Sequence, residues 1–239
     1  MLRTTARLPF GMSDVQTTDH YRGEQGRRYH EQKRGIPEPA FPWVAQSRAN
    51  KIAPYIKPTD IVFEYGVGWG WNLAGLNSAR KIGYDISETI QEKLRERGIE
   101  TVSSVDAIAA DSVDVVLCHH TLEHLLEPAD ALKEMHRMLR PSGKLLLYVP
   151  FERESRYTRF DRQEPNHHLY SWNCQTLGNL VEECGFKVDQ AEVATFGYDR
   201  FSAAWAVRLG IGQWGYNLIQ RSIMLLKPAF EVRVVATRS

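Results

Sequence analysis

Residues 64–70 run E-Y-G-V-G-W-G, an acid followed by three alternating glycines. Glycine lets the backbone take positive φ and approach a ligand closely. The apolar run before them, residues 61–63, is rich in β-branched residues and too short for a helix, so it predicts a buried strand. We predict a helix over residues 71–79, whose N-terminus would face a ligand held at the glycines. A strand, a glycine loop and a helix in this order indicate a site for a nucleotide-type cofactor.

A second acid stands at the distance that such a cofactor requires. Asp85 ends the next predicted strand, residues 81–85, and lies 19 residues after Gly66. In nucleotide sites a carboxylate about 20 residues beyond the loop accepts hydrogen bonds from the ribose hydroxyls. We therefore expect Asp85 to bind a ribose, and the alternative is a surface acid at the end of a strand.

The spacing of the glycines separates two classes of cofactor. The dinucleotide fingerprint is G-x-G-x-x-G, whereas here the glycines alternate and position 71 is Trp. This spacing argues against a nucleotide-binding oxidoreductase. The pattern resembles motif I of the class I S-adenosylmethionine (SAM) dependent methyltransferases. The resemblance implies that the loop lies along the methionine part of SAM and that Glu64 neighbours the amino group of the cofactor.

A longer stretch carries the same resemblance. The segments D-V-V-L-C (114–118), L-E-H-L (122–125) and L-R-P-S-G-K-L-L-L-Y-V-P (139–150) closely resemble the central half of the small-molecule class I methyltransferases. The family's fold is α/β, a Rossmann-like doubly wound seven-stranded sheet with an antiparallel last strand, which we expect here with an N-terminal helical extension. The resemblance also implies that the turn after the third strand contacts adenine. The residues expected to bind SAM are Glu64, Tyr65, Gly66, Gly68, Gly70, Asp85, Ile86, Asp106, Ala107 and His119.

Histidines supply the candidates for a general base. The segments H-L-Y-S-W (168–172) and L-V-E-E-C-G-F (180–186) resemble a subgroup with many glycan, lipid-linked and secondary-metabolite methyltransferases. A hydroxyl acceptor benefits from a base, and His is best tuned near neutral pH. Our candidates are His167, His168 and His120, in that order. We expect O-methylation of a small molecule, sugar or lipid-linked glycan by in-line transfer, and the alternative is a SAM-binding partner or sensor protein without catalysis.

A metal site is a competing interpretation of one segment. His120, Glu123 and His124 fit H-x-x-E-H, the inverted zinc-protease motif. That chemistry needs both histidines on one uninterrupted helix, but here the motif directly follows a predicted strand and Pro128 comes four residues later. We therefore expect no zinc hydrolase and no bound metal. Ubiquinone-biosynthesis O-methyltransferases carry E-x-x-E-H at the matching place, so metal-assisted O-methylation through these three residues is an alternative.

The composition of the chain limits the kinds of partner and compartment that we expect for it. The chain has 239 residues, enough for one well-buried domain, and a net charge of +1, which creates no global attraction to nucleic acid or to an anionic membrane. Its three cysteines show no metal or redox spacing and suit a reducing compartment. No uncharged stretch after residue 200 approaches the roughly 20 apolar residues of a membrane span. We expect a cytoplasmic protein with no nucleic-acid partner.

One segment precedes the expected SAM-binding domain, residues 59–239, and another is inserted within it. We expect residues 1–58 to form a tail and a helix that opens at Pro42, either as a lid over the cofactor or packed against the sheet edge. Residues 196–228 form an aromatic-rich insertion with scattered arginines, in which glycines argue against one long helix. We expect a substrate cap, with a dimer surface or a helix at the membrane interface as alternatives.

Overall fold

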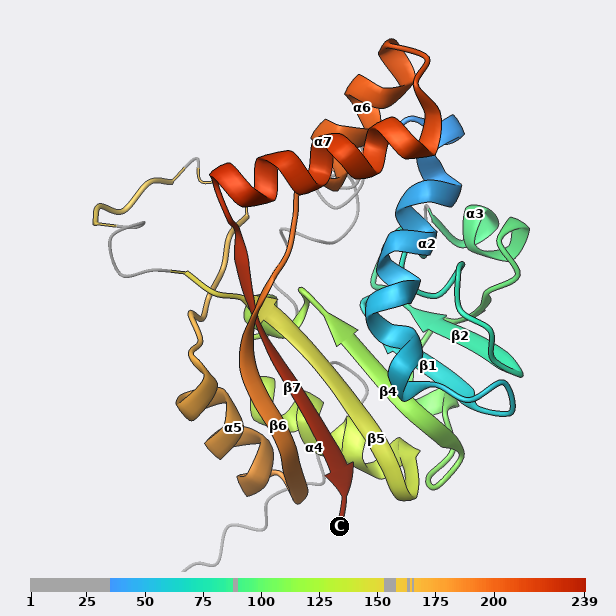
Figure 1. The fold of residues 1–239 in the computed structure, drawn as a ribbon. Coiled ribbons are helices and arrows are strands. Elements are labelled where there is room, and N and C mark those ends of the chain that lie inside the picture. The colour runs from blue at the N-terminus through green and yellow to red at the C-terminus, as the bar shows by residue number, and fades with distance from the viewer. Residues whose placement is uncertain (1–34, 88–89, 153–157, 163, 165) are drawn as a thin grey trace, which may run out of the picture.

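One seven-stranded sheet organises the molecule (Figure 1). The computed structural model describes residues 35–87, 90–152, 158–162, 164 and 166–239. The strand order is β3-β2-β1-β4-β5-β7-β6, and β7 runs antiparallel to both of its neighbours. The strands are β1 (Ile61–Tyr65), β2 (Arg80–Tyr84), β3 (Glu100–Val102), β4 (Val113–His119), β5 (Leu139–Pro150), β6 (Phe186–Thr195) and β7 (Phe230–Arg238). The expected doubly wound sheet with an antiparallel last strand is confirmed.

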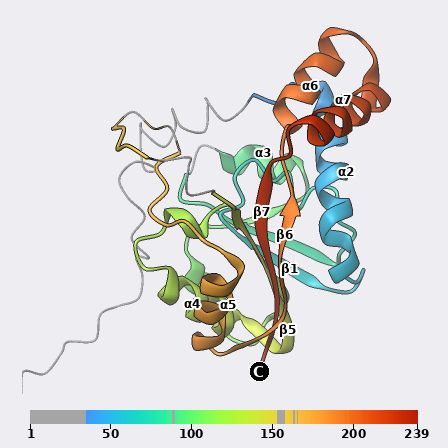
Figure 2. The ribbon, with the colours of Figure 1, turned by 60° about the vertical axis from the view of Figure 1, so that its left-hand side comes forward.

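Helices cover both faces of the sheet. Helices α4 (Pro128–Met138) and α5 (Cys174–Glu183) pack on one face, and α2 (Phe41–Ile52) and α3 (Gln91–Glu96) pack on the other. Figure 2 shows α4 and α5 on one side of the strands and α2 on the other. Because both faces are covered, the central strands need apolar residues at successive positions. In β1, Val62 packs with α2 while Phe63 packs with α4.

The helix predicted over residues 71–79 is wrong. This segment forms turns over residues 71–75, with Ala74 N–H donating to Gly70 O at 3.0 Å. A side chain at Gly75 would lie 2.7 Å from the backbone oxygen of Ala45, so the segment packs directly on α2. Glycine, asparagine and serine at 75, 77 and 78 are also weak helix formers. Residues 71–79 therefore offer the glycine loop no helix N-terminus.

The N-terminal helix is confirmed, with a start one residue earlier than predicted. Helix α2 begins at Phe41 and continues as a short turn, Ala53–Tyr55. Its buried residues are Val44, Ala45, Ala49 and Ile52. Residues 1–34 of the expected tail lie outside the described residues, and whether residues 1–58 act as a lid stays a prediction.

The insertion folds as two helices, α6 (Asp199–Arg208) and α7 (Gly212–Leu226), which lie together at one end of the sheet (Figure 1). Gly210 lies between them and Gly212 begins α7, both with positive φ, so the segment is not one long helix. Among the described residues, no helix is both long enough and apolar enough to cross a membrane. The other short turns are Glu38–Ala40, Val105–Ala107 and Leu122–His124.

Candidate active site

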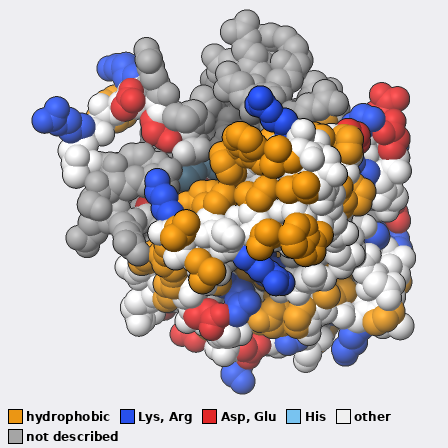
Figure 3. All heavy atoms as spheres, turned by 45° about the horizontal axis from the view of Figure 1, so that its top comes forward, with side chains coloured by type: hydrophobic (Ala, Val, Ile, Leu, Met, Phe, Trp, Pro, Cys, Tyr) orange, Lys and Arg blue, Asp and Glu red, His pale blue; other side chains and the backbone are white. Residues whose placement is uncertain are grey.

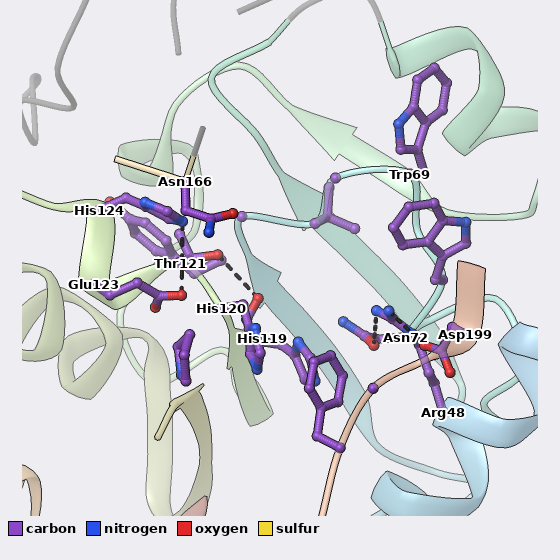
Figure 4. A pocket seen from close by; sticks show the side chains of 18 of the residues that line it. Arg48, Trp69, Asn72, His119, His120, Thr121, Glu123, His124, Asn166 and Asp199 are labelled. Carbon is purple, nitrogen blue, oxygen red and sulfur yellow. Dashed lines mark hydrogen bonds and ion pairs between the residues drawn. The ribbon is translucent and has the colours of Figure 1, made fainter. Parts of the chain in front are cut away.

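A cavity of about 450 Å³ opens at the carboxyl ends of the parallel strands. The last residues of β1, β2, β4 and β5 line it, as do residues before β7 and α6. In an open α/β sheet, ligands bind at the carboxyl ends of the parallel strands. Figure 4 shows Arg48, Asn72 and Asp199 at one side, Glu123, His124 and Asn166 at the other, and His119 and His120 between them.

Backbone hydrogen bonds hold the glycine loop, residues 66–70, against the end of β2. Backbone N–H groups of Gly66 and Val67 both donate to Tyr84 O, at 2.8 and 2.9 Å. Gly68 N–H donates to the carboxylate of Asp85 at 2.8 Å. The end of β2 therefore fixes the path of the loop along the cavity.

The three glycines of the loop serve different purposes. A side chain at Gly66 would collide with Thr121, and one at Gly70 would collide with Leu94 and Ile99 in the core. A side chain at Gly68, whose φ is +49°, would meet no atom within 4 Å. Gly68 also lines the cavity, so the missing side chain there leaves space for a ligand.

Asp85 lies where the sequence predicted a ribose-binding acid. It lines the cavity with its neighbours Tyr84 and Ile86. One carboxylate oxygen accepts from Gly68 N–H and the other from Ser87 N–H, at 2.8 and 3.0 Å. Each carboxylate oxygen accepts more than one hydrogen bond. Asp85 can therefore hold the loop and accept from ribose hydroxyls at the same time.

Glu64 lies beneath the loop and does not line the cavity. It is fully buried, and its Oε1 accepts from Asn72 Nδ2 at 2.5 Å. Its Oε2 has no hydrogen-bond partner among the described residues. Burial raises the pKa of this carboxyl to about 8, and the bond from Asn72 offsets part of that effect. A cation arriving nearby would favour the ionised form.

Arg48 connects the cavity to the insertion, a contact that sequence reasoning missed. Its Nε donates to Asp199 Oδ2 at 2.9 Å, and its Nη1 donates to Asn72 Oδ1 at 3.3 Å. Tyr216 and Gln220 of α7 also donate to Asp199, at 3.1 and 2.7 Å. The separation of 151 residues between Arg48 and Asp199 gives no local signal in the sequence.

His119 ends β4 and His120 follows it, and their rings stack with centroids 4.5 Å apart. His120 Nε2 lies 3.1 Å from Glu231 Oε2, and Lys51 Nζ lies 2.8 Å from Glu231 Oε1 and 2.9 Å from His119 Nε2. Burial lowers the pKa of both histidines. Burial opposes ionisation of Glu231, but hydrogen bonds and charge from His120 and Lys51 outweigh it and lower its pKa. The predicted base His120 thus lines the cavity, with one ring nitrogen engaged by Glu231.

A second group, which we call the histidine wall, comprises Glu123, His124, Glu152, Asn166 and His168. His168 Nδ1 lies 2.9 Å from Glu152 Oε1, and the rings of His124 and His168 meet edge to face at 4.9 Å. Both histidines and Asn166 line the cavity. The buried Glu152 carboxylate therefore orients a histidine that faces the ligand space.

The other predicted base is placed differently. His167 is exposed, does not line the cavity, and has a φ of 51°. Its backbone N–H donates to Glu164 at 2.7 Å. The turn therefore directs two sequence neighbours to different environments.

Two groups of side chains have metal-ligating atoms within 4.8 Å of one another among the described residues. One is His119, His120 and Glu231, and the other is Glu123, His124 and His168. The trio of the metal alternative, His120 with Glu123 and His124, is split between them. The positive φ of His120 begins a turn, Leu122–His124, that carries the two later residues to the histidine wall.

Residues 63–147, from β1 to β5, match the methyltransferase domain family. The chain carries a class I S-adenosylmethionine-dependent methyltransferase domain. A probable S-adenosylmethionine-dependent methyltransferase from Mycolicibacterium smegmatis is 31% identical over 129 residues, 52% of this chain and 50% of that protein. The chain spans about a third to a half of the length of the curated relatives it matches.

Solved structures share the fold of this methyltransferase domain. A SAM-dependent methyltransferase from Thermotoga maritima aligns with a TM-score of 0.59 at 21% identity, covering 89% of this chain and 97% of its own. A cyclase aligns with a TM-score of 0.55 at 18% identity, covering 81% of this chain and 79% of its own. The likeness therefore establishes the fold, and the reaction must be inferred from the residues of the site.

The methyltransferase domain offers SAM a fitting place at the glycine loop. Gly68 provides open space beside the backbone, Asp85 provides carboxylate acceptors, and Glu64 has a buried oxygen without a hydrogen-bond partner among the described residues. Of the residues expected to bind SAM, the cavity is lined by Tyr65, Gly66, Gly68, Asp85, Ile86 and His119.

The remaining expected residues lie outside the cavity. Glu64 is buried beneath the loop, Gly70 packs into the core, and Asp106 and Ala107 are exposed in a short turn. Sequence reasoning missed the cavity residues Arg48, Trp71, Asn72, Asn166 and Asp199.

Proposed function

We propose that this protein transfers the methyl group of SAM to a hydroxyl oxygen of a small molecule, sugar or lipid-linked glycan. The observation that carries the proposal is a single cavity lined both by the glycine loop with Asp85 and by His168, which Glu152 holds at 2.9 Å. One region suits the nucleotide cofactor, and the other places a base in the same cavity.

In this proposal SAM, when bound, supplies an electrophilic methyl group. The glycine loop and Asp85 hold the nucleoside and methionine parts, so that the acceptor meets the methyl group in a fixed orientation. His168 takes the proton from the acceptor hydroxyl as the oxygen becomes nucleophilic. Glu152, at Nδ1, fixes the tautomer and stabilises the imidazolium that forms.

The pairing of His168 with Glu152 supports oxygen over nitrogen as the acceptor atom. A hydroxyl is a weak nucleophile until its proton is removed, so an oriented base is useful to it. The general-base candidates are thereby reordered, with His168 before His120 and His167.

The domain's cysteines support a reducing location. Cys118, Cys174 and Cys184 are free thiols, although disulfides prevail in oxidising compartments. We propose the cytoplasm as the place where this enzyme works.

The test is calorimetric titration with SAM and with its demethylated product, followed by an acceptor screen of sugars and phenols. We expect micromolar binding of both, weakened about tenfold or more in Asp85→Ala because the ribose loses its acceptor and the loop loses an anchor. Absence of binding to either compound by the folded protein would contradict the proposal. Binding without turnover of any acceptor would favour a SAM-binding protein without catalysis.

A further inference from the structure

The outward side of α6 and α7 carries an apolar surface that the fold does not use. We call it the α6–α7 face, and its hydrophobic residues are Phe201, Trp205, Leu209, Trp214, Leu218 and Leu225. Trp214 and Leu225 are 72% and 85% exposed. Figure 3 shows hydrophobic side chains gathered on this side of the molecule with basic side chains among them.

This face is separate from the side of the helices that packs on the protein. Ala203, Ala206 and Tyr216 are fully buried, and they form a small core with Val44 of α2. The exposed residues instead recur at helical spacing, at 201 and 205 in α6 with 209 just after it, and at 214, 218 and 225 in α7 with 211 just before it. Each helix is therefore apolar on two sides, and large exposed apolar patches mark interaction surfaces.

The positive charge of the α6–α7 segment indicates which kind of partner it would bind. Residues 200–230 contain Arg200, Arg208, Arg221 and Lys227 and no Asp or Glu, in a chain whose net charge is only +1. All four basic residues are exposed. A second copy of the chain would place like charges against each other, whereas an anionic surface would complement them.

We propose that the α6–α7 face docks on an anionic lipid surface. Tryptophan and leucine side chains would enter the boundary between headgroups and acyl chains, and the arginines would contact the anionic headgroups. The helices would lie in the plane of the membrane. Arg200, which lines the cavity, directly precedes Phe201 of the face, so docking would bring the cavity close to the headgroups. The docking does not depend on the proposed methyl transfer.

The test is co-sedimentation of the full chain with vesicles of phosphatidylcholine alone and of phosphatidylcholine mixed with phosphatidylglycerol. We expect binding to the mixed vesicles and little to the neutral ones. Trp214→Ser combined with Leu225→Ser should lower the partition roughly a hundredfold, because both side chains lose their burial in lipid. Arg208→Gln combined with Arg221→Gln should lower it roughly twentyfold and weaken its salt dependence.

The control is Val193→Ser, which changes an exposed hydrophobic residue of β6, and it should leave the partition unchanged. Circular dichroism would verify that each variant is folded. No binding to the mixed vesicles, equal binding to both kinds, or unchanged binding by the Trp214→Ser, Leu225→Ser variant would overturn the proposal. A dimer in light scattering that this variant dissociates would also overturn it, by assigning the face to a second copy.

Discussion

The glycine loop and the histidine wall line one cavity, but the chain builds them in different ways. The loop and Asp85 come from residues 65–85, one continuous segment in which β1 and β2 set the positions. The histidine wall joins residues 123 and 124 to residue 152 and to residues 166 and 168. A site made by one segment leaves a spacing in the sequence, whereas a site made by several segments depends on how they pack.

The two regions also differ in the charges that lie beneath them. Under the loop, burial raises the pKa of Glu64 to about 8. Next to the histidine wall, burial lowers the pKa of His119 and His120, while the pKa of Glu231 is lowered by its partners. The loop region therefore favours an uncharged carboxyl in this structure, and the other region favours neutral histidines with a charged carboxylate.

The largest expected effect is a loss of SAM affinity when the glycine loop is changed. Gly68→Val would fill the open space beside the backbone and should lower SAM affinity about a thousandfold or more, measured by calorimetry, because contacts along the ligand are lost. Gly98→Val is the matched control, because Gly98 also has positive φ and no neighbour within 4 Å but does not line the cavity. Equal loss in both variants would show that backbone strain, and not the ligand space, explains the effect.

The role of the histidine wall is tested by comparing His168 with its sequence neighbour His167. His168→Ala should lower kcat by about 10²- to 10⁴-fold, the usual contribution of a general base, while leaving SAM affinity unchanged. His167→Ala, at an exposed residue outside the cavity, should keep full activity. Full activity in His168→Ala, or an unchanged pH profile of kcat, would remove His168 from the mechanism.

The ion pair between α2 and β7 supports the region next to the wall. Lys51→Met would leave the buried Glu231 without its cationic partner and should lower the free energy of unfolding by about 3 kcal/mol or more, measured by urea denaturation. Lys93→Met removes an exposed pair with Glu96 and should cost less than about 1 kcal/mol. Similar losses in both variants would contradict a special role for the buried pair.

The smallest expected effect concerns stability, which the two regions should change in different pH ranges. Glu64 has a raised pKa, so the stability gained from its protonation is present below about pH 4.5 and is lost as the pH rises toward about 8. His119 and His120 have lowered pKa values, so the unfolded state binds protons first and stability falls below about pH 6.5.

Glu64→Gln should therefore raise the melting temperature relative to the natural protein at about pH 8 and leave the acid-side loss in place, as measured by calorimetry. Glu92→Gln, at an exposed glutamate of α3, is the control and should change neither side. An identical melting profile for Glu64→Gln and the natural protein would contradict the raised pKa of Glu64.

The sequence predicted the parts that local rules control. The apolar runs predicted that β1, β4 and β5 are buried, and both faces of these strands are covered. The resemblance to the class I methyltransferases supplied the doubly wound sheet. Glycine spacing placed the loop, and the offset to Asp85 placed the acid beside it, as the bond from Gly68 shows. These features depend on residues that are close in the chain, so composition and order are enough to predict them.

Local rules failed where another segment decided the outcome. The helix predicted over residues 71–79 does not form, because Gly75 lies against α2 and the turn around it exposes Asn72 to the cavity. His120 and His124 are close in the sequence, but a turn sends one toward Glu231 and the other toward His168. Neither result follows from propensity, since each depends on the backbone path between packed elements.

The sequence by itself determined the buried strands and the glycine loop, because strand burial and loop spacing are properties of short segments. The resemblance of its motifs to the class I methyltransferases supplied the order of the sheet and the class of cofactor. Only the tertiary structure decided which histidine faces the cavity, how Arg48 reaches Asp199, and which side of α6 and α7 stays exposed. Contacts between residues far apart in the chain form when segments pack, and the free energy of packing belongs to the pair of surfaces and not to either segment alone.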